Sequence, residues 1–154
     1  MEIPELLASN GVFAKLRVAS KRQALQELAR RAAALLQIDE HRIFEILLER
    51  EQLGSTGIGG GTAVPHGRIA NLAKPTALFA RLEKPVDFEA IDGQPVDLVF
   101  LLLTPSDASA DHLKALARIS RLLRDRAICA KLRGTEDADA IYALLTDRAA
   151  SHAA

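Results

Sequence analysis

The stretch that decides the fold is Val96-Asp97-Leu98-Val99-Phe100-Leu101-Leu102-Leu103-Thr104, which is apolar at nearly every position. A short continuous apolar run of this kind, bounded by Pro95 and Pro105, is typical of a central strand that is buried on both faces. A strand covered on both faces needs other elements above and below it. We therefore expect a sheet packed with helices, which is an α/β fold.

The distribution of glycine and proline places the other elements around this strand. Six of the nine glycines lie at 54–67, and five of the six prolines lie at 65–105. These residues interrupt regular helices, so the middle of the chain is expected to be loop and strand and the outer parts helical. Further strands are predicted at 76–82 and 86–90, and Asp92-Gly93 is expected to form a tight turn before the central strand.

Helix start signals are found on both sides of this middle region. Ser20, with Gln23 three residues later, forms a capping box, Asp39 can cap a second helix, and Ser109 is a candidate cap for a third. Two shorter helices are expected at 126–132, before Gly134, and at 137–148. The chain length of 154 residues suits one domain spanning 1–154, with a core at about 5–147 and a frayed tail at 149–154.

Composition excludes several classes of function. Twenty Lys and Arg balance twenty Asp and Glu, and with no Trp and one Tyr there is neither a basic stripe nor a stacking platform for nucleic acid. The longest apolar run, 98–103, is too short to cross a bilayer, and no secretory signal precedes it. The single cysteine, Cys129, fits a reducing compartment. We therefore expect a cytoplasmic protein without membrane insertion.

The stretch with the most chemical information is Leu53-Gly-Ser-Thr-Gly-Ile-Gly-Gly-Gly-Thr-Ala-Val-Pro-His-Gly-Arg68. Its glycines allow the backbone to approach a ligand and to turn N–H groups toward an anion. The spacing matches neither a Walker loop nor a dinucleotide-binding loop. A phosphate-binding role is predicted for Ser55, Thr56, Gly57, Gly59 and Thr62.

Three side chains around this stretch are candidates for phosphoryl chemistry. His66 is either a nucleophile or an ordinary turn histidine. His112 lies in the first turn of the helix near Ser109, where it is either a donor to a phosphoryl oxygen or a helix-cap histidine. Arg50 either binds the phosphoryl group or pairs with Glu49 or Glu51. No residues show the spacing of metal ligands, so no metal site is expected.

These residues also carry a resemblance. Arg50-Glu51-x-x-Gly54-Ser-Thr-Gly-Ile-Gly59, continuing to Ala63-Val-Pro-His-Gly67, resembles the active-site signature of IIA domains in the mannitol/fructose branch of the bacterial phosphoenolpyruvate-dependent phosphotransferase system. The stretch Asp111-His112-Leu113 resembles the second histidine element of this family. The similarity runs from about Glu5 to Leu145 and is strongest to the nitrogen-related form.

The resemblance implies a three-layer α/β sandwich with a mixed central sheet flanked by helices. It also implies a phosphotransferase component without a cofactor, in which His66 accepts a phosphoryl group from an HPr-like phosphocarrier protein and His112 and Arg50 hold its oxygens. Regulatory target proteins are the implied partners, and no attached IIB or membrane segment is expected. The alternative is a sugar-specific IIA component that passes phosphate to a IIB domain. A third interpretation is a module that acts by docking alone.

Overall fold

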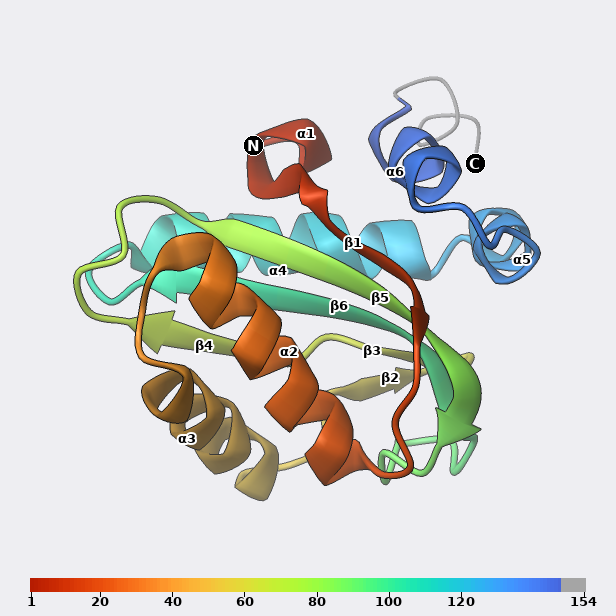
Figure 1. The fold of residues 1–154 in the computed structure, drawn as a ribbon, viewed down its shortest axis with the longest axis horizontal. Helices are drawn as coiled ribbons and strands as arrows, with labels where there is room; N and C mark the ends of the chain where they lie inside the picture. Colours follow the sequence, from red (N-terminus) through yellow and green to blue (C-terminus); the bar gives the residue numbers. More distant parts are fainter. Residues whose placement is uncertain (148–154) are drawn as a thin grey trace.

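The computed structural model describes residues 1–147 (Figure 1). The predicted tail at 149–154 and the last residue of the helix predicted at 137–148 therefore lie outside the described residues. In chain order the elements are α1 (Ile3–Leu6), β1 (Leu7–Leu16), α2 (Lys21–Leu36), α3 (Glu40–Gln52), β2 (Gly57–Gly59), β3 (Thr62–Ala63), β4 (His66–Ile69), β5 (Thr76–Val86), β6 (Val96–Pro105), α4 (Ser109–Leu123), α5 (Arg126–Arg133) and α6 (Ala138–Thr146).

The strands form one mixed sheet in the order β1-β5-β6-β3-β2, and β4 also pairs with β6. β5 and β6 form an antiparallel pair, whereas β1 runs parallel to β5, and both β3 and β4 run parallel to β6. The short strands β3 and β4 follow one another along the same side of β6, where Thr62 is opposite Leu98 and His66 is opposite Leu102. The predicted central strand is therefore confirmed, since β6 has partners on both sides.

Helices cover both faces of the sheet, which gives the expected three layers. α2 and α3 lie over one face, and α4 lies behind the sheet in Figure 1. Alternate residues of β6 enter the two cores. Val99, Leu101 and Leu103 pack with α2 and α3, whereas Leu98, Phe100 and Leu102 pack with α4, α5 and α6. All six side chains are fully buried, which explains why the strand has almost no polar positions.

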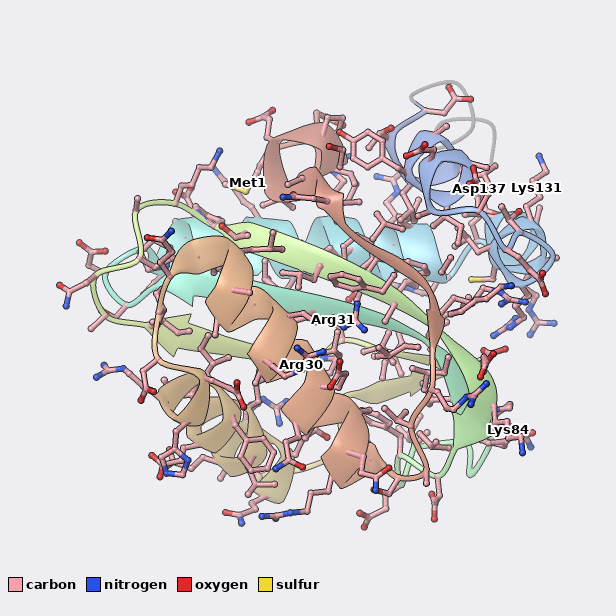
Figure 2. All side chains as sticks on the ribbon, viewed as in Figure 1. Met1, Arg30, Arg31, Lys84, Lys131 and Asp137 are labelled. Atoms are coloured by element: carbon pink, nitrogen blue, oxygen red, sulfur yellow. The ribbon has the colours of Figure 1, made fainter. Side chains whose placement is uncertain are left out.

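Several predicted helix boundaries are confirmed at the level of single hydrogen bonds. Ser20 Oγ accepts from the backbone N–H of Gln23, and Asp39 accepts from the N–H of Arg42. Asp137 caps α6 in the same way. Side chains on the outer surface are largely charged, as Arg30 and Arg31 on α2 illustrate (Figure 2), and both of these arginines pair with Glu27.

The prediction that the outer parts of the chain are helical is wrong for the N-terminus, where β1 occupies Leu7–Leu16. Its centre, Ser9-Asn10-Gly11, has low strand propensity and no apolar alternation. The strand forms because β5 offers a parallel partner, with two irregularities in the register. Tertiary pairing decides this element rather than local sequence.

Three local predictions around the middle of the chain also need correction. No separate strand forms at 86–90, because β5 continues to Val86 and pairs there with Val96. The turn at Asp92-Gly93 is present, with Gly93 in the left-handed region (φ 72°), inside the loop 87–95. Ser109 does not cap α4. Ala108 is the N-cap residue, and no side chain caps this helix.

Candidate functional site

The C-terminal end of α3, strand β4 and the N-terminal turn of α4 line an open cavity of about 520 Å³ at the surface. Three of the predicted site residues meet there, although they come from different elements. The cavity is lined by Ile46, Glu49, Arg50, Gln52, Leu53, His66, Gly67, Arg68 and His112. The structure therefore brings together His66, His112 and Arg50, the three side chains that the sequence analysis proposed for phosphoryl chemistry.

His66 is the first residue of β4 and is held at both ring nitrogens. Its Nδ1 lies 2.8 Å from the carbonyl oxygen of Val64, and its Nε2 lies 3.2 Å from Nε of Arg50. A carbonyl oxygen can only accept, so Nδ1 carries the proton and donates. Nε2 then keeps its lone pair, which accepts from the Arg50 N–H. The geometry thus assigns one tautomer and leaves Nε2 as the nucleophilic nitrogen.

The surroundings keep this imidazole neutral. Burial lowers the pKa of His66 below its ordinary value of 6.5, and the positive charge of Arg50 lowers it further. The hydrogen bond to Val64 opposes this change without reversing it. A neutral imidazole whose Nε2 carries no proton is the form that can attack an electrophile at pH 7, once the Arg50 N–H turns away from it.

Arg50 reaches His66 because α3 packs closely against β4. Gly67 makes this approach possible, since a Cβ atom at this position would lie 2.4 Å from Cγ2 of Ile46 on α3. Arg50 also donates from Nη1 to the carbonyl oxygen of Gly54 at 2.8 Å. Neither Glu49 nor Glu51 forms an ion pair with it, so the alternative of a simple helix-end ion pair is not what the structure shows.

Glu51, which follows Arg50, points to the other side of α3 and anchors the start of the glycine-rich stretch. This buried carboxylate accepts from the backbone N–H and the hydroxyl of Thr56, and it pairs with Nζ of Lys21 at 2.8 Å. The Lys21 ammonium also lies 5.2 Å from the ring centre of Phe88. Sequence reasoning treated Glu51 only as a partner for Arg50 and missed this network.

His112 is buried in the first turn of α4, with its ring centre 5.4 Å from that of His66. Its Nδ1 lies 2.6 Å from Oγ1 of Thr104, a fully buried residue near the end of β6. If Nδ1 donated, the Thr104 hydroxyl proton would have no acceptor in the described part of the chain. The hydroxyl therefore donates to Nδ1, which leaves the proton of His112 on Nε2. Sequence reasoning did not single out Thr104, because an isolated threonine ending an apolar strand carries no signal of its own.

The electrostatics of His112 follow from the same position. Burial, with added repulsion from His66 and Arg68, lowers the pKa of His112 to about 4. It is therefore a neutral hydrogen-bond donor at pH 7. Arg68, which sequence reasoning also missed, lies two residues after His66 on β4, lines the same cavity and donates from Nη1 to Oγ of Ser109 at 2.9 Å.

The predicted phosphate-binding residues of the glycine-rich stretch lie outside this cavity. Ser55 donates to the carbonyl oxygen of Phe88, Thr56 to Glu51, and Thr62 to the carbonyl oxygen of Gly59. Gly57 lies against Ala90, and a Cβ there would contact it at 2.7 Å. These contacts hold the shape of the chain between α3 and β4.

Two further properties concern the described residues as a whole. Within 1–147, no helix is both long and apolar enough to span a bilayer. The same residues contain no cluster of three His, Cys, Asp or Glu side chains that could hold a metal ion. The cavity instead offers two neutral imidazoles and two guanidinium groups, a set suited to an anion such as a phosphoryl group.

Comparison with known proteins identifies the family. Residues 5–148 match the family described as "Phosphoenolpyruvate-dependent sugar phosphotransferase system, EIIA 2". A nitrogen regulatory protein of Bradyrhizobium diazoefficiens is 58% identical over 145 residues, which cover 94% of this chain and 95% of the relative. A nitrogen regulatory protein of Escherichia coli is 36% identical over 148 residues, covering 96% and 91%.

A solved structure agrees with this assignment. The nitrogen regulatory protein IIA-Ntr of Neisseria meningitidis has a TM-score of 0.88 and 35% identity to this chain, and the match covers 94% of this chain and 99% of the other. The similarity thus extends over the whole sheet and its helices. The chain belongs to the EIIA-2 family of the phosphoenolpyruvate-dependent sugar phosphotransferase system.

Proposed function

We propose that this protein is a phosphohistidine carrier and regulator of the nitrogen type, which accepts a phosphoryl group on Nε2 of His66 from an HPr-like phosphocarrier protein. The observation that carries the proposal is the hydrogen bonding of His66. Its Nδ1 is bound to the Val64 carbonyl, and its Nε2 lone pair faces Arg50 inside the cavity.

The transfer step balances without an external base. The Nε2 lone pair attacks the phosphorus of the donor phosphohistidine, and the donor N–P bond breaks with its electrons returning to the donor imidazole. The proton on Nδ1 of His66 stays in its hydrogen bond to Val64 throughout. The Arg50 N–H that now faces Nε2 turns to a phosphoryl oxygen when the new N–P bond forms.

Charge stabilisation then decides the rate, because phosphoryl transfer requires mainly positioning and electrostatic support. Arg50 supplies one guanidinium and His112 supplies a neutral N–H from Nε2. Arg68 supplies a second guanidinium from the same cavity. Because the Ser55, Thr56 and Thr62 hydroxyls are engaged elsewhere, we narrow the proposed oxygen-binding set to Arg50, His112 and Arg68.

Exposed apolar side chains near the site offer a docking surface for a protein donor. Leu53 is 85% exposed and lines the cavity, and Leu113, next to His112, is 65% exposed. Exposed leucines near a polar centre are suited to brief docking of another protein. The HPr-like carrier is the proposed donor, and regulatory proteins are the proposed later partners.

The nitrogen type is favoured over a sugar-specific component by the relatives. Nitrogen regulatory proteins from Bradyrhizobium and Escherichia are 58% and 36% identical to this chain, and the matches cover 95% and 91% of their own lengths. Such a regulator works among cytoplasmic proteins, in agreement with the single cysteine. We further propose that 1–154 folds as one domain.

The proposal is tested by reconstituted transfer. The protein is incubated with labelled phosphoenolpyruvate, enzyme I and the nitrogen-type HPr-like carrier. We expect an acid-labile, base-stable phosphoprotein whose modification maps to His66 by mass spectrometry. Transfer onward to a purified fructose-type IIB domain at a comparable rate would instead favour the sugar-specific alternative. Labelling at another residue, or none, would contradict the proposal.

Replacing Thr104 with valine should slow phosphoryl transfer by about 10-fold to 100-fold. Without the hydroxyl, Nδ1 of His112 loses its donor, and the ring no longer holds its proton on Nε2. ¹⁵N spectra of the imidazole should show the change of tautomer, which mere loss of packing would not cause. Thr104→Ser keeps the hydroxyl and should retain most of the activity. An unchanged tautomer in the valine variant would refute this role.

Stability should fall as the pH is lowered from about 6.5 toward 4. In the unfolded chain both imidazoles have their ordinary pKa of 6.5, whereas burial lowers the pKa of His66 and brings that of His112 to about 4. Between these values the unfolded state binds more protons, so acid favours unfolding. Chemical denaturation at a series of pH values measures this dependence. His112→Gln should flatten it, and an equally steep curve in that variant would count against the assignment.

A further inference from the structure

The glycine-rich stretch has a part that the phosphoryl site does not use. Gly59 and Gly60 line a second groove of about 630 Å³, at the other end of α4 from His112. Its walls come from the turn between β2 and β3, the loop after β5, the end of α4 and helix α5. The lining residues are Ile58, Gly59, Gly60, Ile91, Asp92, Leu123, Arg124, Arg126, Cys129 and Arg133.

The wall of this groove is held in place by hydrogen bonds to both backbone groups of Gly60. Its N–H donates to Oδ2 of Asp92 at 2.9 Å, and its carbonyl oxygen accepts from Nη2 of Arg133 at 2.7 Å. Arg133 is itself paired with Asp97 at 2.9 Å. Gly60 has a φ of 66° and open space where a side chain would project. The groove is therefore preformed, with a bare backbone at its edge.

Exposed apolar side chains lie along this edge. The described residues include four exposed large hydrophobic side chains, two of which, Leu53 and Leu113, flank the phosphoryl site. The other two, Ile91 at 87% and Ile58 at 38% exposed, both line this second groove. Exposed isoleucines beside a groove are typical of a protein contact.

Positive charges outnumber negative ones in the groove lining, which holds Arg124, Arg126 and Arg133 but one carboxylate, Asp92. Arg124 and Arg126 are exposed, and neither is paired with a carboxylate within residues 1–147. The nearby carboxylates keep their negative charge, but their oxygens already accept hydrogen bonds. Asp92 accepts from the N–H groups of Gly60 and Gln94, Asp97 binds Arg133, and Asp125 accepts from the N–H groups of Ala127 and Ile128.

We propose that this groove docks an acidic segment of a partner protein, with carboxylates against Arg124 and Arg126 and an apolar side chain between Ile58 and Ile91. Charge complementarity selects this occupant, since the isoleucines attract any apolar chain but the unpaired guanidinium groups select an acidic one. His112 and Leu123 are eleven positions apart in α4, which is about 16 Å along the helix. The segment therefore binds without covering His66, independently of the proposed phosphorylation.

The test uses a synthetic peptide of repeated Glu-Glu-Leu triplets, with a Gln-Gln-Leu peptide as its uncharged match. Each is titrated into the full ¹⁵N-labelled chain to about 1 mM. We expect shift changes with the acidic peptide that cluster at Ile58–Gly60, Ile91 and Leu123–Arg126. The double variant R124E/R126E should bind it about tenfold more weakly, because two exposed attractions become repulsions. Arg42→Glu, an exposed charge reversal on α3, serves as the matched control.

The outcomes separate this proposal from the others. Ile91→Ser should also weaken binding, and both groove variants should be phosphorylated as fast as the parent. The proposal is overturned by equal binding of the Gln-Gln-Leu peptide, by shifts centred on Leu53 and Leu113, or by no shifts at all. Concentration-dependent broadening of groove residues without peptide would overturn it in favour of a second copy of this chain. A parent protein that is not labelled at His66 would contradict only the phosphocarrier proposal.

Discussion

Phosphoryl labelling by the HPr-like carrier is expected to disappear when His66 is replaced with alanine. The other imidazole of the cavity is not expected to take over the attack, because the Nδ1 lone pair of His112 is buried against the Thr104 hydroxyl and its Nε2 carries the proton. We expect the rate to fall by at least about 10⁴-fold, as for other covalent nucleophiles. Quench-flow transfer from labelled carrier to the parent and variant measures this directly.

The control for this result is another histidine in the same chain. His41 is exposed on α3, where its Nε2 lies 2.8 Å from a carboxylate oxygen of Glu45. It is not among the residues that line the phosphoryl cavity. His41→Ala should be labelled as fast as the parent. The circular dichroism spectrum of His66→Ala should match that of the parent, because the half-buried imidazole is not part of either hydrophobic core. Undiminished labelling of His66→Ala would rule out His66 as the acceptor.

Replacing Glu51 with alanine is expected to lower the free energy of unfolding by about 3 kcal/mol. The substitution leaves the Lys21 ammonium without its near partner and frees the N–H and hydroxyl of Thr56 in a buried site. Lys21 is 15% exposed, so water offsets part of the loss. In thermal unfolding this corresponds to a drop in Tm of about 10 °C.

The matched control uses the second carboxylate beside Lys21. Glu89 lies 3.8 Å from Nζ of Lys21 but is 79% exposed, so Glu89→Ala should change stability by less than about 0.5 kcal/mol. The two variants differ in burial rather than in charge. Equal losses in both would show that Glu51 contributes only surface charge. The loop after α3 also sets Arg50 against Gly54, so folded Glu51→Ala should transfer phosphate more slowly as well.

Much of the fold could be predicted because its signals are local. An apolar run such as 96–104 has only one stable environment, between two helical layers. Helix starts such as Ser20 and Asp39 are satisfied by the next turn of the same chain. β1 escaped prediction because its Ser9-Asn10-Gly11 centre has no strand pattern, and it forms by pairing with β5.

The residues of the candidate site also differ in whether the sequence alone could identify them. His66, His112 and Arg50 were singled out by residue type, local position and family resemblance, and the cavity unites them. Thr104 was missed because an isolated threonine near the end of an apolar strand carries no signal, and Arg68 because its contact with Ser109 joins β4 to α4, which lie far apart in the chain. The hydroxyls of Ser55, Thr56 and Thr62 looked free in sequence, yet each finds an internal acceptor once the chain is folded.

The sequence by itself determined that this protein is an α/β fold built around one apolar strand, and which residue types are available for phosphoryl chemistry. Only the tertiary structure decided which nitrogen of His66 is free, which proton His112 keeps, and that Gly59 and Gly60 belong to a different groove. The physical reason is that a tautomer or a groove wall is set by hydrogen bonds of the folded backbone and side chains, whether the partner is as near in the chain as Val64 is to His66 or as far as Arg133 is from Gly60. No local pattern along the chain can specify those contacts.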